Sequence, residues 1–354
     1  MQLQWRFAMR AMIALLCAAA AYADRAAPLN VLLIAVDDLR TEISPYPEGA
    51  HMHTPNLERL ANRSVVFERA YVQVAVCMPS RTALLTSRRP DTSRSWTIEE
   101  DQYWRKSGGN FSTLPQVFRE QHGYFVCGMG KIFHESAKDS DNQDHRFSWS
   151  PECLEPHYQG TKDPGIYDPK GISPPSAADG KSRAAYRFPD DDKTYSKIQD
   201  GALADRAVAT LQRINNASAS ATGGAFAPPF FLAVGFHKPH IPWYVPGRFF
   251  AMYPNDTDVP LAPNPGKPTN APDIAMQNFI VGECKASDLG DDKCGHFTKA
   301  FPNDNTTVGD EAARYMRHAY WAAVSFTDYN VGRVLDALDA GPHANNTIIV
   351  LFGE

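Results

Sequence analysis

Beyond its N-terminus the chain lacks any apolar run long enough to cross a bilayer, and it has no internal repeats or low-complexity tracts. It also lacks a strong excess of charge, because 35 Lys and Arg residues against 40 Asp and Glu residues leave a net charge of −5. A mildly acidic chain makes no general case for nucleic-acid binding. We therefore expect any anionic ligand to be held by local cations or by a metal ion.

The N-terminus has the pattern of a secretory signal peptide. Arg6 and Arg10 precede an apolar run over residues 12–21, and AYA at 21–23 is a small-x-small cleavage site. The apolar run is well under the roughly 20 residues that a membrane span needs. We expect residues 1–23 to be removed and the mature chain to follow the secretory pathway to a lysosome or the cell exterior, or to the periplasm if bacterial. Six N-glycosylation sequons favour the same route: Asn62, Asn110, Asn216, Asn255, Asn305 and Asn345.

Loss of this leader leaves five cysteines. An odd number in an exported protein predicts one unpaired thiol, and we nominate Cys77. Cys284 and Cys294 lie in a polar, Gly-rich segment and are suited to closing a small disulfide ring. Cys127 lies in an apparent core strand, where it either pairs with Cys153 or remains a free buried thiol.

Short apolar runs alternate with helical patterns along the 354 residues. The β-type runs cover 29–36, 65–71, 124–129, 230–235 and 347–352, and the helical patterns cover 55–64, 113–122, 312–340 and a segment from 79 onward. Segments 136–200 and 254–310 are polar and predict long loops or insertions. The alternation predicts an α/β fold with a mainly parallel central sheet and helices on both faces. The site of such a sheet lies at the carboxyl ends of its strands.

Polar residues follow three of these strands. Asp37 and Asp38 follow the strand at 29–36. GKIFH at 130–134 follows the strand at 124–129, and FHKPH at 236–240 follows the strand at 230–235. Adjacent carboxylates suit a hard divalent cation, and Lys and His suit an anion and its proton transfers. Taken alone, Asp37-Asp38 fits a helix N-cap or a turn better. Because all three groups of polar residues follow strand ends, a functional site is favoured. The pattern alone does not indicate which reaction the site performs.

CMPSR at 77–81, followed by LTSR at 85–88, resembles the signature of the type I sulfatases. That signature is Cys-x-Pro-Ser-Arg, a short helix and Leu-Thr-Gly-Arg, so Ser87 stands where the family has Gly. Within the family, the segments VLLIAVDDLR, RRPDTSR, GKIFH and FFLAVGFHKPHIP are similar to the iduronate-2-sulfatase group. The match is dense over 29–134 and 228–250 and returns over 312–350. It implies the alkaline-phosphatase-like α/β fold of this superfamily.

The resemblance implies that a formylglycine-generating enzyme oxidises Cys77 to formylglycine, whose hydrate is the nucleophile. It also implies one Ca²⁺ ion at the site. The implied metal ligands are Asp37, Asp38, Cys77 and Glu354.

The other site residues are also implied by the resemblance. Arg81 holds the hydrate and offsets its charge. Lys131 and His134 bind the sulfate, with His134 as the base for sulfate release. His237 binds near the sulfate and donates a proton to the leaving alcohol, and Lys238 is a second substrate-binding cation.

The end of the chain departs from the family pattern. The family has Asp or Asn followed by His-Gly after the strand at 347–352, whereas this chain stops at Glu354. We therefore expect residues 24–354 to be an incomplete catalytic domain, inactive in this form, from a fragment or a truncated gene model. For His240, a capping or packing role is slightly favoured.

The function expected from this pattern is removal of sulfate from a sulfated sugar, with a 2-O-sulfated uronate of glycosaminoglycan as the candidate substrate. A phosphonate or phosphodiester hydrolase is an alternative, because related folds with the same Cys motif perform that reaction. A non-catalytic glycan-binding remnant is another, favoured by the early end and by Ser87.

Overall fold

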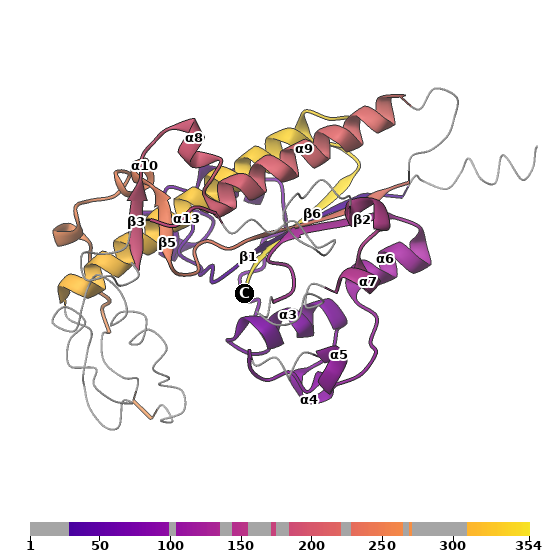
Figure 1. Cartoon of the computed structure of the whole chain (residues 1–354). Helices are drawn as coiled ribbons and strands as arrows, with labels where there is room; N and C mark the ends of the chain where they lie inside the picture. Colours follow the sequence, from indigo (N-terminus) through magenta and orange to yellow (C-terminus); the bar gives the residue numbers. More distant parts are fainter. Residues whose placement is uncertain are drawn as a thin grey trace, which may run out of the picture.

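The centre of the fold is a parallel sheet of four strands in the order β2-β4-β1-β6 (Figure 1). The strands are β1 (Asn30–Val36), β2 (Phe125–Gly130), β4 (Phe230–Phe236) and β6 (Thr347–Gly353). The computed structural model describes residues 28–98, 104–134, 144–154, 171–174, 184–220, 228–264, 269–270 and 310–354. The α/β class expected from the sequence is confirmed.

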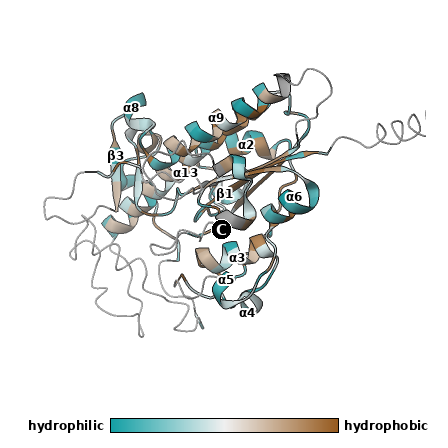
Figure 2. Ribbon diagram, turned by 45° about the vertical axis from the view of Figure 1, so that its right-hand side comes forward, coloured by the Kyte–Doolittle hydropathy of each residue, from teal (hydrophilic) through white to brown (hydrophobic). Residues whose placement is uncertain are grey.

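Helices cover both faces of this sheet. One face packs on α2 (Pro55–Ala61), α9 (Gln199–Ser220) and α13 (Asp310–Asp339). The other face packs on α3 (Cys77–Thr86) and α6 (Leu114–His122). Successive side chains of β1 enter opposite cores, with Leu32 in the first and Leu33 in the second. Burial on both faces explains why the strands appear as nearly continuous apolar runs, and Figure 2 shows them as hydrophobic between partly hydrophilic helices.

A second, two-stranded parallel sheet packs on α13. It pairs β3 (Ala185–Phe188) with β5 (Trp243–Pro246), and Phe188, Val245 and Phe326 belong to its core. The remaining short elements are η1 (Pro47–Gly49), α4 (Pro90–Ser93), α5 (Trp104–Ser107), α7 (His145–Ser148), η4 (Pro151–Leu154), α8 (Asp192–Tyr195), α10 (Gly247–Phe250) and η5 (Asp256–Asp258). Within the described ranges, no helix is both long enough and apolar enough to span a membrane.

One expectation about secondary structure is wrong. Residues 65–71 form no strand and are exposed, with Val65 at 80% and Tyr71 at 83%, because β-prone side chains without a neighbouring strand gain nothing from an extended backbone. Segment 136–200, expected as long loops or insertions, contains the short elements α7, η4, β3 and α8 and the start of α9. The expected signal peptide at 1–23 and the Cys284–Cys294 pair lie outside the described residues.

The open question about Cys127 is answered by a disulfide between Cys127 in β2 and Cys153 in η4, with a Cα–Cα distance of 5.2 Å. Cys77 is the free cysteine of the described part of the chain, as nominated. The disulfide ties the segment after α7 to the core strand that precedes Lys131.

Replacing both Cys127 and Cys153 by alanine is expected to lower the free energy of unfolding by about 2–4 kcal/mol, because the bond closes a loop of 26 residues in the unfolded chain. Equilibrium denaturation in urea measures the change. Treatment with a reductant should destabilise the native protein by about this amount more than it destabilises the double variant, which keeps only the expected Cys284–Cys294 pair. An equal response of both proteins to the reductant would contradict the assignment.

Candidate active site

The strand register brings the expected site residues to one edge of the sheet. Val36 of β1 is level with Phe236 of β4 and with Gly353 of β6, and Gly130 of β2 is level with Gly235. The next residues of these strands are Asp37, His237, Glu354 and Lys131. The carboxyl edge therefore gathers residues from segments far apart in sequence, as the predicted topology requires.

Close contact between the ends of β2 and β4 fixes the start of the segment that carries Lys131. The Lys131 N–H donates to the Gly235 carbonyl at 2.8 Å. A Cβ on Gly235 would lie 2.0 Å from the Lys131 carbonyl oxygen, so no other residue fits there without movement of the backbone. Gly130 has a φ of +69°, which turns the chain toward the site.

Cys77 is the first residue of α3, and Arg81 follows one helical turn later on the same face. Val76 before it is extended, and Pro79 lies in the first turn, where its missing N–H costs nothing. Ser87, at the position of the family glycine, caps the helix in the left-handed region with φ 55°. The substitution therefore leaves the helix end in the conformation that glycine usually supplies.

The Cys77 thiol is held in its neutral form. Burial, followed by the negative charge of Asp37, raises the pKa of Cys77 to about 11. Lys131 opposes this effect without overcoming it. At neutral pH the unmodified thiol is therefore a poor nucleophile, since thiolates react and thiols do not.

Alkylation of unmodified Cys77 by iodoacetamide in the presence of EDTA is expected to be slow at pH 8, by roughly 10²-fold relative to a free thiol of pKa about 8.5. The rate should climb as the pH rises toward about 11, because the thiolate forms above the pKa. A rate profile over pH, read by mass spectrometry, gives the midpoint. A midpoint between pH 8 and 9 would contradict this environment for the thiol.

Asp37 is the anionic centre of the cluster and is fully buried. Its Oδ1 accepts from Arg81 Nη2 at 3.2 Å, and its Oδ2 accepts from Lys131 Nζ. Burial alone would raise the pKa of Asp37, but the charges of Arg81 and Lys131 outweigh burial and lower it. Asp37 is therefore ionised at any physiological pH and compensates two buried cations.

Glu354 completes this network from β6. Its Oε1 accepts from Arg81 Nε at 2.7 Å, and its carbonyl oxygen accepts from the Asp38 N–H at 3.0 Å. Burial is the largest cause that raises the pKa of Glu354 to about 7, and the adjacent Asp37 adds to it against the opposing charge of Arg81. Asp38 has a left-handed φ of 56° and a side chain 50% exposed. Partial burial, then the charge of Asp37, raises the pKa of Asp38.

His134 lies beyond β2 near the same cations. Burial, then the charges of Lys131 and Arg81, lowers the pKa of His134 to about 4. Its Nδ1 is buried and has no hydrogen-bond partner among the described residues. The imidazole is therefore neutral near pH 7 and able to accept a proton.

The loop at 237–240 supplies the remaining groups. Lys238 is 5% exposed and its Nζ donates to the His240 carbonyl at 3.1 Å. Burial lowers the pKa of Lys238, although Asp200 and Asp37 oppose this. His240 Nε2 lies 3.9 Å from Asp38 Oδ2.

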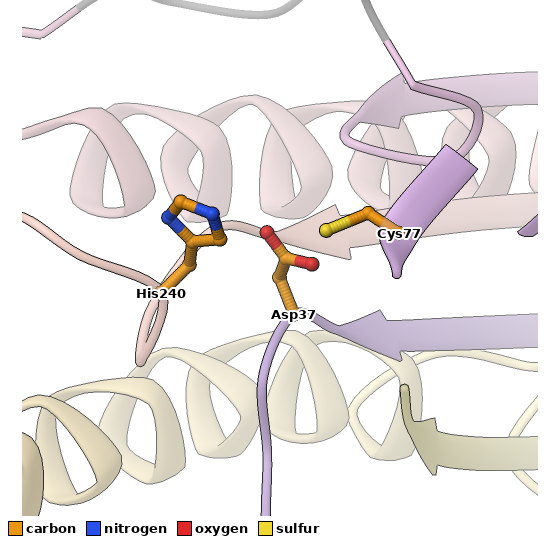
Figure 3. Close-up of side chains that lie close together, drawn as sticks. All are labelled: Asp37, Cys77 and His240. Atoms are coloured by element: carbon orange, nitrogen blue, oxygen red, sulfur yellow. The ribbon is translucent and has the colours of Figure 1, made fainter. Parts of the chain in front are cut away.

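The residues present fit a hard divalent cation. The carboxylates of Asp37 and Glu354 adjoin each other, and Glu354 Oε2 is a buried acceptor without a donor among the described residues. Figure 3 shows the Cys77 sulfur and the Asp37 carboxylate turned toward each other, with His240 on the other side of Asp37. Ligand atoms of these three residues all lie within 4.8 Å of one another. Oxygen ligands suit Ca²⁺. Asp38, the next residue after Asp37, is not part of this group of three, and its side chain is half exposed.

Two further residues lie close to the site. His240, for which a capping or packing role is slightly favoured by the sequence, has a ligand atom within 4.8 Å of those of Asp37 and Cys77. Asp200, in the first turn of α9, contacts the loop at 237–240 and is fully buried. The spacing of Leu203, Ala207 and Leu211 was a usable signal for that helix, but nothing in the sequence connects Asp200 to the loop.

Comparison with known proteins agrees with this geometry. The sulfatase family model matches residues 29–354. Iduronate 2-sulfatases of Mus musculus and Homo sapiens are 35% and 36% identical to the chain, and each comparison covers 92% of this chain and 54% of the relative. The chain thus spans about half the length of these two relatives. The solved structure of a phosphonate monoester hydrolase from Silicibacter pomeroyi shares the fold with a TM-score of 0.56 at 21% identity, over 92% of this chain and 62% of that one. With a signature cysteine at the head of α3 and a family match across nearly its whole length, this chain belongs to the sulfatase family.

Proposed function

We propose that this protein is a sulfatase that removes sulfate from a sulfated sugar, with 2-O-sulfated uronates of glycosaminoglycans as its substrate class. The main support is the position of Cys77, at the start of α3, beside Asp37 and one turn before the buried Arg81. The sugar substrate is supported by the names of the two iduronate 2-sulfatases, at 35% and 36% identity.

We further propose that Cys77 is oxidised to formylglycine by a separate formylglycine-generating enzyme. Asp37, Asp38, Glu354 and the modified side chain at position 77 would hold one Ca²⁺ ion. When present, the hydrated formylglycine supplies the nucleophilic oxygen and the ion supplies positive charge for the sulfate oxygens.

The protein's own side chains then divide the remaining work. Arg81 and Lys131 place fixed positive charge beside position 77, where an incoming sulfate adds negative charge. Neutral His134 is suited to accept a proton during sulfate release. His237 donates a proton to the leaving alcohol oxygen, and Lys238 is a second cation for the substrate.

A secretory route and a lysosomal or extracellular destination are part of the proposal. The sequon asparagines at 62, 110, 216, 255 and 345 are all exposed, and Asn305 lies outside the described residues. Exposed acceptor sites are what N-glycosylation requires, since the glycan must remain in solvent.

Turnover by the protein at its full natural length, produced with a formylglycine-generating enzyme, tests the proposal. We expect a 2-O-sulfated iduronate disaccharide to give a higher kcat/KM than choline sulfate or bis(4-nitrophenyl) phosphate. A higher kcat/KM on the phosphodiester would contradict a sulfatase and favour a phosphodiester hydrolase. A higher value on choline sulfate would contradict only the sugar substrate.

A further inference from the structure

The buried carboxylate of Asp200 holds the backbone of the loop that carries His237 and Lys238. Its Oδ1 accepts from the His237 N–H at 3.0 Å, and its Oδ2 accepts from the Lys238 N–H at 2.7 Å. Both donors lie just beyond the end of β4. One carboxylate that uses both oxygens on consecutive amides fixes the direction in which the chain leaves the sheet.

The same carboxylate lies against the ring of His237, because Oδ1 is 3.4 Å from His237 Nδ1. Asp200 is 0% exposed, so no solvent screens this contact. A carboxylate beside Nδ1 favours the tautomer with a proton on that nitrogen. Proton exchange with a substrate would then run through Nε2.

Two further hydrogen bonds hold the loop without involving Asp200. Thr327 Oγ1 of α13 donates to the Lys238 carbonyl at 2.8 Å, and the His240 N–H donates to the His237 carbonyl at 2.9 Å. The loop therefore stays attached to α13 when Asp200 is altered. A substitution of Asp200 is therefore expected to change the orientation of His237 without unfolding the loop.

We propose that Asp200 is a positioning residue, which acts through His237 to aim the proton donor at the leaving-group oxygen. The proposal rests on the sulfatase function proposed above and adds to it a residue that does not touch the substrate. Asp200 binds the loop through two backbone N–H groups, and its Oδ1 lies 3.4 Å from Nδ1 of the His237 ring.

The decisive variant is Asp200→Asn, which keeps the shape but gives up one of the two acceptor oxygens and the charge. The substrates are a 2-O-sulfated iduronate disaccharide, whose alcohol leaves poorly without a proton, and 4-nitrophenyl sulfate, whose phenolate leaves unaided. We expect kcat/KM to fall by about 10²–10³-fold on the disaccharide and by less than roughly tenfold on the aryl sulfate. Asp205→Asn is the matched control, because Asp205 is 39% exposed on the same helix and pairs with Arg333; both activities should be unchanged.

A double-variant comparison tests the route of action. Adding Asp200→Asn to His237→Ala should cost little further activity on the disaccharide, since residues that act as one unit are not additive. Equal losses on both substrates, no loss, or full additivity with His237→Ala would each contradict the inference. If Asp200→Asn does not fold, Asp200→Glu takes its place, because it keeps the carboxylate and displaces it. The same comparison then applies: a larger loss of kcat/KM on the disaccharide than on the aryl sulfate is expected. All variants are made in the protein at its full natural length, and a wild-type protein of that length without sulfate-ester turnover would contradict the proposed function itself, and the inference with it.

Discussion

In the protein at its full natural length, produced with a formylglycine-generating enzyme, replacing Cys77 by alanine is expected to lower kcat/KM for sulfate-ester hydrolysis by at least about 10⁴-fold, because the nucleophile is lost while the surrounding cations remain. Arg81, Lys131 and Asp37 bind one another and do not depend on the Cys77 side chain, so the variant should fold. Steady-state kinetics on a sulfated disaccharide, with the melting temperature as a folding check, measure the effect. Leu84→Ala is the control, since Leu84 is 40% exposed on the same helix and should keep activity within about twofold.

Replacing Cys77 by serine distinguishes the role of the attacking oxygen from the role of the aldehyde hydrate in sulfate release. A hydroxyl attacks sulfur but offers no second hydroxyl for the release of sulfate. We therefore expect Cys77→Ser to stop after one event per molecule and to accumulate a sulfated residue that intact-mass measurement detects. Multiple turnover by Cys77→Ser, or undiminished activity of Cys77→Ala, would contradict the proposed mechanism.

The second large effect concerns stability. Asp37→Asn is expected to lower the free energy of unfolding by about 3–5 kcal/mol, because it leaves Arg81 and Lys131 buried with less compensating charge. Arg81 is 2% exposed and Lys131 is 8% exposed, so water cannot take the place of the lost carboxylate. Equilibrium unfolding in urea, with EDTA present to remove bound cations, measures the change.

The control for this measurement is Asp91→Asn. Asp91 is exposed in α4, and its replacement should alter the free energy of unfolding by no more than about 0.5 kcal/mol. A loss below about 1 kcal/mol in Asp37→Asn would show that Asp37 does not compensate the two cations.

The site edge was predictable because parallel strands place their carboxyl ends together. Asp37, Lys131 and His237 each follow a strand that the apolar runs identified, so topology alone gathered them. The structure also places Glu354 there, directly after Gly353, which is level with Val36 at the end of β1. Neither strand alternation nor spacing carries information about which nitrogen or oxygen faces which partner.

What the sequence did not predict depends on contacts between distant segments. Asp200 meets the loop at 237–240 only because α9 packs across the sheet, and no local pattern encodes that placement. The proximity of His240 to Asp37 and Cys77 likewise depends on the path of the loop after β4 and not on any local pattern. The run at 65–71 has strand propensity but finds no partner strand, so tertiary context overrides propensity.

The direct test of the central claim is mass spectrometry of the peptide that contains position 77, from protein produced in a host with the formylglycine-generating enzyme. We expect the lighter aldehyde form in place of the Cys77 thiol, and a hydrazide probe should label that peptide alone. Cys77 recovered only as an unmodified thiol from such a host would contradict formylglycine catalysis in this protein.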